Sequence, residues 1–270
     1  MRTRLAGRYR SAFRGPGLEF EGLVPYASDH DVQRIDWLVT ARRGRPFVRR
    51  YVEERELRVL VALDVSPSMA TGARERALLL LTALALSAAR AGDRSGAVLF
   101  ADQVVDIVPA TRGRNHALDL VRRCLETETE ASTTDPRPLL RRLLNLRGHA
   151  AVFLLSDFLW QPPPWDEDVQ RMLGAAARKH DLLAVRLLSF CPDRGAGSLL
   201  LDCVDPEAGR SAAASVRRLG AELTAHRART RAAAHTGGVH LGELPPGGDD
   251  LLGLERLLSA HGGRSRRRRR

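Results

Sequence analysis

Short apolar runs of strand length alternate with segments of helical periodicity along most of this chain. Residues 57–64 form a run rich in valine and leucine, and aliphatic residues recur at helical spacing over 73–91. A second apolar run, 150–155, precedes a helical pattern over 166–180. Strands that are apolar throughout are typical of a sheet covered on both faces. The alternation therefore predicts an α/β fold: a doubly wound, mostly parallel sheet with helices on both faces.

Further segments extend this pattern toward both ends of the predicted sheet. Two strands, 95–100 and 104–108, are expected to form a hairpin. Another strand is predicted over 182–188, and a short hairpin is expected near 199–204 with a turn at Asp205. The remaining predicted helices cover 115–125, 136–146, 212–234 and 249–261.

The regions that flank the alternation differ from it in composition. Residues 1–55 carry several glycines and prolines without a long helical period, which predicts a small strand- and loop-rich leader packed on the main domain. Residues 56–262 form the predicted α/β domain. Residues 263–270 hold six arginines, contribute much of the net charge of +11, and are predicted to be a disordered tail.

Several classes of protein and site do not fit this sequence. The strongly apolar run 77–89 is shorter than the roughly 18–20 residues that span a bilayer, so no membrane span is expected. The basic N-terminus lacks a following apolar region, so we expect a cytoplasmic location. Cys124, Cys191 and Cys203 lack the spacing of a zinc site and are interpreted as packing residues.

Polar side chains follow the first buried strand, where open α/β sheets bind ligands. Asp64, Ser66 and Ser68 alternate in a short loop and can present hard oxygen atoms to Mg²⁺. Asp157 follows another predicted strand, and the polar loop 132–135 precedes a helix, so both can reach the same edge. Three loops are therefore expected to converge on one ion.

The Asp-x-Ser-x-Ser sequence, a later loop threonine and a still later aspartate resemble the metal-ion-dependent adhesion site of von Willebrand factor A domains. The matching residues are Asp64, Ser66, Ser68, Thr134 and Asp157, with Thr133 as an alternative to Thr134. In such domains the serines and the threonine usually ligate the ion directly, and the acids partly through water. The resemblance implies an open coordination position that an acidic side chain of a partner fills.

The leader resembles that of the domain of unknown function 58 family, a bacterial and archaeal group of von Willebrand A-like proteins. Residues 35–37 read Ile-Asp-Trp and residues 41–42 read Ala-Arg, as is usual in the family, whereas residues 29–31 depart from its Gly-Asp-Asp. Members are commonly encoded beside MoxR-type AAA+ ATPases and are thought to act with them in chaperone-like assembly or activation of other proteins. The resemblance therefore implies such an ATPase, or its client, as the partner.

These observations favour a non-catalytic protein-interaction domain that depends on Mg²⁺ or Mn²⁺. One alternative is a magnesium-dependent phosphohydrolase of haloacid-dehalogenase type, although Ser66 stands where its second acid would be and Lys179 is the sole lysine. A second alternative, nucleic-acid binding through the arginine tail, is a minor one that could coexist with the first.

Two groups of aromatic and charged residues have both a structural and a functional interpretation. In the leader, Arg34, Asp36, Trp37 and Arg42 are expected to dock that segment on the main domain rather than to contact a partner. Beyond Asp157, the loop that carries Trp160 and Trp165 could contact a partner or pack locally, and the sequence leaves both open.

Overall fold

The computed structural model describes residues 12–13, 18–27, 35–53, 57–70, 72–188, 200–204 and 211–268. Its internal contacts divide the chain into two units, Arg14–Glu56 and a larger unit made of Met1–Phe13 and Leu57–Arg270. No helix in the described ranges is long and apolar enough to cross a membrane.

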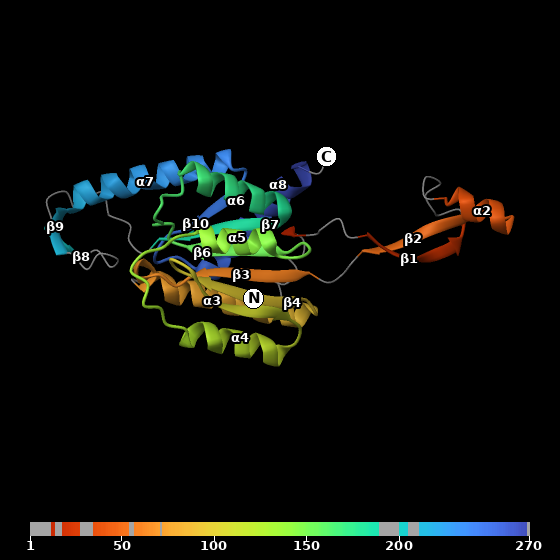
Figure 1. Cartoon of the computed structure of the whole chain (residues 1–270), viewed down its shortest axis with the longest axis horizontal. Helices are drawn as coiled ribbons and strands as arrows, with labels where there is room; N and C mark the ends of the chain where they lie inside the picture. Colours follow the sequence, from red (N-terminus) through yellow and green to blue (C-terminus); the bar gives the residue numbers. More distant parts are fainter. Residues whose placement is uncertain are drawn as a thin grey trace. The chain divides into compact units, whose positions relative to one another are not determined.

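A six-stranded sheet lies at the centre of the larger unit, with the order β10-β7-β6-β3-β4-β5 (Figure 1). Neighbouring strands are parallel except for β4 and β5, which form an antiparallel hairpin. The strands are β3 (Arg58–Asp64), β4 (Arg94–Phe100), β5 (Val104–Thr111), β6 (Ala151–Ser156), β7 (Asp181–Leu187) and β10 (His240–Leu244). The predicted α/β fold with a mostly parallel sheet is therefore confirmed.

Each face of the sheet has its own apolar core. Along β3, Val59, Val61 and Leu63 face one core, whereas Leu60 and Ala62 face the other, because successive side chains of a strand point to opposite faces. The first core is covered by α3 (Ala73–Ala91), α4 (Arg114–Glu126) and α8 (Asp250–Arg268). The second is covered by α5 (Arg137–Asn145), α6 (Glu167–Lys179) and α7 (Val216–Thr236).

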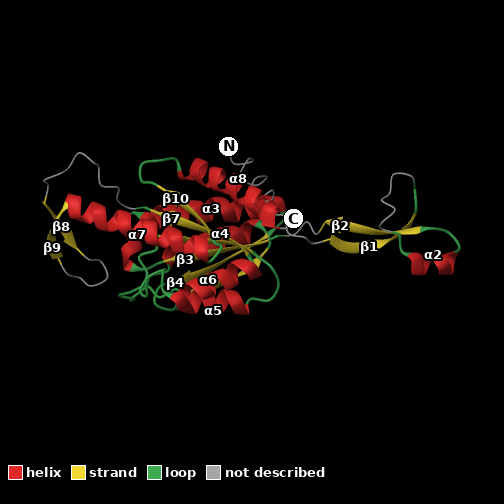
Figure 2. Cartoon of the chain, turned by 90° about the horizontal axis from the view of Figure 1, so that it is seen from above, coloured by secondary structure: helices red, strands yellow, loops and turns green. Residues whose placement is uncertain are grey.

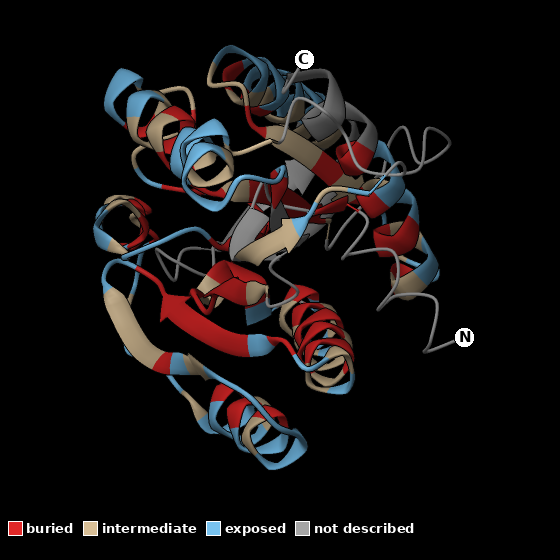
Figure 3. Ribbon diagram, turned by 90° about the vertical axis from the view of Figure 1, so that its right-hand side faces the viewer, coloured by how far each residue is buried: buried red, intermediate tan, exposed pale blue. Residues whose placement is uncertain are grey.

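Helices thus cover both faces, as the apolar strands predicted. Figure 2 shows α8 and α5 on opposite sides of the sheet, and Figure 3 shows buried residues on the strands and on the inner sides of the helices. Cys124 lies buried in α4, which confirms its packing role, while Cys191 lies outside the described residues.

Most elements agree with the sequence-based bounds to within a residue or two. The exceptions are β5, which ends at Thr111 rather than at residue 108, and the elements toward the C-terminal end. Helix α3 has the predicted bounds, and the hairpin of β8 (Leu200–Val204) and β9 (Ser211–Ser215) is present. Strand β10 was not predicted from the sequence, because it is only five residues long and contains Gly242. A Cβ atom at Gly242 would lie 2.4 Å from the Leu257 methyl groups, so glycine there allows α8 to approach the strand.

The predicted bounds of the main domain need two corrections. Helix α8 continues to Arg268, through most of the segment expected to be a disordered tail. Arginine has a high intrinsic helix propensity, which is compatible with a helical backbone there. At the other end, Ala12 and Phe13 belong to the first core, and the Phe13 ring lies 4.9 Å from the Phe153 ring. These two residues were assigned to the leader.

The smaller unit contains a hairpin of β1 (Leu18–Pro25) and β2 (Phe47–Glu53), with helix α2 (Trp37–Arg43) between the two strands. Asp36 begins this helix, because its carboxylate accepts hydrogen bonds from the amides of Leu38 and Val39. The strands match the prediction, and the short helix is an addition to it. Trp37 is 69% exposed, and Arg34 lies outside the described residues. Docking of the leader on the main domain stays a prediction.

Candidate metal centre

The parallel order of β3 and β6 brings two acidic loops to one edge of the sheet. The two strands are direct neighbours, and Leu63 is paired with Leu155. Asp64 is the last residue of β3, and Asp157 directly follows the end of β6. Both carboxylates therefore lie at the carboxyl end of the sheet, where the sequence analysis placed them.

The loop after β3 folds tightly around the Asp64 carboxylate. One oxygen, Oδ1, accepts a hydrogen bond from the Ser66 amide at 3.0 Å and another from the Ser66 hydroxyl at 2.6 Å. The hydroxyl oxygens of Ser66 and Ser68 are 3.2 Å apart. A short 3₁₀ helix, η2 (Pro67–Ala70), completes the turn and keeps both serines buried. The predicted trio of oxygen-bearing side chains is thus assembled.

Ser156 joins the two acidic loops, and the sequence analysis did not include it among the site residues. Its hydroxyl oxygen accepts hydrogen bonds from the Phe158 amide at 2.8 Å and the Trp160 indole at 2.9 Å. The same oxygen lies 2.6 Å from Asp64 Oδ2. Because both nitrogens are donors, the single hydroxyl proton of Ser156 is available for Asp64. Its position at the end of a buried strand, next to Asp157, was the available sequence signal.

Asp157 has one carboxylate oxygen that is paired and one that is not. Oδ1 accepts a hydrogen bond from the Leu159 amide at 2.9 Å. Oδ2 is buried and has no hydrogen-bond partner among the described residues. The side chain as a whole is 7% exposed. A buried acceptor without a donor is unfavourable, and a bound cation would satisfy it.

Burial of two carboxylates at one site changes their acidity. Burial and then the nearby Asp157 charge raise the pKa of Asp64 to about 7. Burial also raises the pKa of Asp157, while the Leu159 amide, the Ser68 hydroxyl and the Arg186 charge act in the opposite direction. A divalent cation would favour the ionised form of both groups.

The Thr134 loop lies against residues 157–166, which follow β6 and are called the post-β6 loop. The Gln161 amide donates a hydrogen bond to the Thr134 carbonyl at 2.7 Å, and the Asp135 amide donates to the Ala101 carbonyl at 2.9 Å. Thr134 is 1% exposed, whereas Thr133 is exposed. Of the two alternative loop threonines, Thr134 is therefore the one held in the protein interior beside the post-β6 loop.

The aromatic residues of the post-β6 loop pack locally. Trp160 is fully buried, and its ring lies 4.5 Å from the Phe158 ring and 6.4 Å from the Phe100 ring. Trp165 contacts His226 at 5.2 Å and lies under the Arg229 guanidinium at 4.8 Å, both distances measured from ring centroids. The packing interpretation holds for Trp160, whose indole also positions Ser156.

Arg186 is a buried positive charge beside the acidic pair, and the sequence analysis missed it. It lies in β7 opposite Ser156 and pairs with Glu243 at 3.2 Å. Its side chain is 1% exposed, and burial lowers its pKa to about 10. An arginine inside an otherwise apolar strand was the available signal, but the register of β7 against β6 decides which carboxylate it faces.

The chain has relatives among known protein families and sequences. Residues 24–233, well over half of the chain, match the family described as "Protein of unknown function DUF58". The chain belongs to this DUF58 family. It is 32% identical over 195 residues to "Uncharacterized protein Rv1480" of Mycobacterium tuberculosis and to "Uncharacterized protein Mb1516" of Mycobacterium bovis. Each match covers 68% of this chain and 59% of the relative, so the chain spans less than two thirds of their length.

Among solved structures, the chain is similar to "conserved hypothetical protein BatB" from Bacteroides thetaiotaomicron. The TM-score is 0.50 at 12% sequence identity, and the match covers 77% of this chain and 99% of the other. At this identity the likeness concerns the fold alone. It agrees with the mostly parallel, helix-covered sheet of this DUF58 chain.

The side chains of this DUF58 site fit a hard divalent cation by their chemistry. They are two buried carboxylates and the hydroxyls of Ser66, Ser68 and Thr134, all oxygen donors of the kind that Mg²⁺ prefers. No group of three or more histidine, cysteine or acidic residues suited to a metal occurs in the described part of the chain. The predicted ligands are two aspartates, two serines and a threonine, so they do not form a group of that kind.

Proposed function

We propose that this DUF58 chain is a non-catalytic protein-interaction domain with a von Willebrand A-like fold that binds a partner through Mg²⁺ or Mn²⁺. Asp64, Ser66, Ser68, Thr134 and Asp157 hold the ion, directly or through water. The observation that carries the proposal is the unpaired Asp157 Oδ2, buried beside a second carboxylate. An ion that few carboxylates contact directly, because the acids act partly through water, keeps residual positive charge and attracts an acidic side chain of the partner.

The proposed partner is a MoxR-type AAA+ ATPase or its client, and the proposed role is chaperone-like assembly or activation of other proteins. This part rests on the family resemblance of the leader and the Asp-x-Ser-x-Ser loop. The proposed location is cytoplasmic. Ser66 supports binding over phosphohydrolysis, because the residue two positions after Asp64 is a hydroxyl that donates to it rather than a second acid.

The first test is thermal unfolding of the full chain with Mg²⁺ and with EDTA. An ion that binds only the folded protein stabilises it by about 2.7 kcal/mol at 100 times its dissociation constant. We expect Mg²⁺ to raise the melting temperature of the wild type and to have little effect on Asp157→Asn. This variant is expected to fold, because Asn keeps an acceptor for the Leu159 amide and removes one of two buried charges.

The matched control is Asp106→Asn, which removes a carboxylate paired with Arg123 at 2.5 Å on the edge strand β5. It is expected to keep the full response to Mg²⁺. An equal response in Asp157→Asn and the wild type would contradict the metal site. If the site is confirmed, retention of a MoxR-type ATPase on the immobilised wild type should require Mg²⁺ and be lost with Asp157→Asn.

A further inference from the structure

Helices α5 and α6 lie side by side, and each presents one stripe of residues to a groove between them. The α5 positions are spaced by four and three residues, and the α6 positions by three, one and three residues, as expected for one face of a helix. The groove has a volume of about 420 Å³. Its lining residues are Arg137, Arg141 and Leu144 from α5, and Asp168, Arg171, Met172 and Ala175 from α6.

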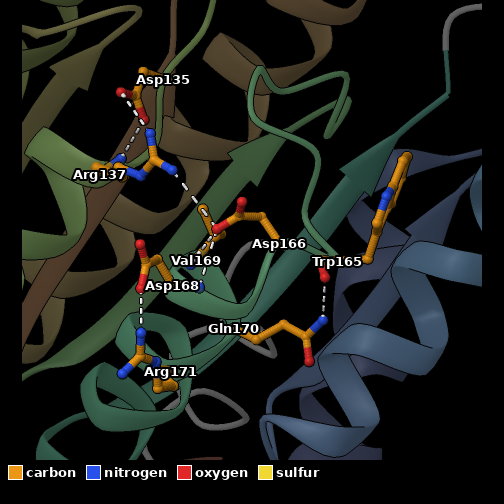
Figure 4. Close-up of polar contacts among 8 residues, drawn as sticks. All are labelled: Asp135, Arg137, Trp165, Asp166, Asp168, Val169, Gln170 and Arg171. Atoms are coloured by element: carbon orange, nitrogen blue, oxygen red, sulfur yellow. Dashed lines mark hydrogen bonds and ion pairs between the residues drawn. The ribbon is translucent and has the colours of Figure 1, made fainter.

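The charged lining of this α5/α6 groove is mainly positive, with three arginines and one aspartate. Arg137 is held between Asp135 at 3.9 Å and Asp166 at 3.6 Å, and Arg171 pairs with Asp168 on its own helix (Figure 4). Arg141 is exposed and makes no hydrogen bond or ion pair with any described residue. The groove therefore offers a free cation beside two that are already oriented.

The floor of the groove is apolar. Leu144, Met172 and Ala175 are each partly exposed there. Methionine has a flexible and polarizable side chain that adapts to irregular apolar partners. Arg141 beside an apolar floor matches a segment with both acidic and apolar side chains, because such a segment pairs with the free guanidinium and covers the floor.

The groove begins close to the candidate metal centre. Arg137 is three residues beyond Thr134. Its backbone amide donates a hydrogen bond to the Asp135 carboxylate at 2.9 Å. A partner that reached the metal with one acidic residue could continue along α5 and α6. None of the proposed metal ligands lines the groove, so binding of a partner to the groove can be tested separately from metal binding.

We propose that the α5/α6 groove binds an acidic, partly apolar peptide segment of a protein partner. The unpaired Arg141 attracts a carboxylate of the segment and the floor contacts its apolar side chains, as in helix-in-groove recognition. A nucleic acid fits less well, because the groove has no aromatic lining residue on which a base could stack and contains Asp168.

The test is fluorescence anisotropy of the full chain with a labelled peptide of about twelve residues, made of glutamate with leucine at every third or fourth position. The groove variant is Arg141→Glu with Arg171→Glu, and we expect it to weaken binding about tenfold. The matched control is Arg142→Glu with Arg178→Glu. It makes the same charge change on the same two helices at exposed positions outside the groove.

The control should change affinity less than about twofold, and replacing the peptide leucines by serine should weaken binding to the wild type. Circular dichroism melts check that both variants fold. Equal loss in the groove variant and the control, or no loss in either, would overturn the proposal. So would a single-stranded oligonucleotide that binds more tightly than the peptide and is lost in the groove variant.

This experiment is independent of the metal proposal. Binding of the acidic peptide to the groove should be unchanged by EDTA and by Asp157→Asn, whereas the Mg²⁺ response should be unchanged by the groove variant. A failure of one proposal would therefore leave the result for the other intact. Peptide binding that requires Mg²⁺ and Asp157 would assign it to the metal centre and overturn the groove.

Discussion

At the scale of single residues, the site depends on which polar atoms share hydrogens inside the protein. Ser156 accepts from two nitrogens and so directs its proton to Asp64, while Asp157 keeps one oxygen unpaired. Both Asp64 oxygens therefore have hydrogen-bond donors, whereas Asp157 Oδ2 lacks one and could be satisfied by a cation. This difference explains why Asp157, rather than Asp64, is the informative position for a substitution that tests metal binding.

Ser156→Ala removes one acceptor and one donor from the interior. The Trp160 indole and the Phe158 amide would lose their partner, and Asp64 Oδ2 would lose its donor. Buried polar groups left unpaired cost about 1–3 kcal/mol each. Because three groups lose a partner, we expect the free energy of unfolding to fall by at least about 3 kcal/mol. Urea unfolding measures it, with Ser87→Ala in α3 as the control.

Ser87 is also a buried serine, at 5% exposure, but it lies in the apolar face of a helix. Alanine has the higher helix propensity there, so this control should be close to neutral. A similar small change in both variants would show that the Ser156 hydroxyl has no special structural part in the site.

At the scale of elements, Arg76 ties the first helix after the site to the far strands of the sheet. From α3 its guanidinium donates to the carbonyls of Leu188, Leu244 and Pro245 at 2.7–3.0 Å. It also pairs with Asp250, in the first turn of α8, at 2.5 Å. One side chain therefore joins α3, the ends of β7 and β10, and α8.

We expect Arg76→Ala to lower the free energy of unfolding by about 2–4 kcal/mol, because it leaves Asp250 without its cation at 8% side-chain exposure. The control is Arg90→Ala, an exposed arginine in the last turn of the same helix, for which a change of less than about 0.5 kcal/mol is expected. Chemical denaturation of both variants measures the two changes in the free energy of unfolding. Equal effects would contradict a specific tie by Arg76.

At the scale of the whole molecule, the core of the larger unit takes in residues 12–13, which precede the smaller unit in sequence. Phe13 is fully buried against Phe153 and His261, while residues 14–56 form the smaller unit. In sequence, the smaller unit is thus inserted between Phe13 and Leu57 of the larger unit. Its boundaries are a property of packing and were not visible in the composition of residues 1–55.

Phe13→Ala is expected to destabilise the larger unit by about 3–5 kcal/mol, as is usual for truncating a buried aromatic side chain. Leu38→Ala is the control, because Leu38 is 66% exposed in the smaller unit and should change stability little. Thermal and urea unfolding of both variants measure the difference. A negligible effect of Phe13→Ala on stability would contradict the assignment of residues 12–13 to the core of the larger unit.

The sequence by itself determined the fold class, most of the elements and the edge where polar loops meet. These follow from local properties: buried strands are apolar throughout, helices repeat their apolar positions, and Asp64 and Asp157 stand where predicted parallel strands end. Burial of Thr134 beside the post-β6 loop also agrees with the choice of loop threonine made from the motif.

The tertiary structure alone decided which distant residues meet. The register of β6 between β3 and β7 places Ser156 against Asp64 and Arg186 across from Ser156, and no local pattern encodes that register. The packing of α8 on Gly242 shows a fifth parallel strand that its own short sequence did not indicate. Likewise, the α5/α6 groove exists because two helices present their stripes to each other, which depends on packing rather than on either helix sequence.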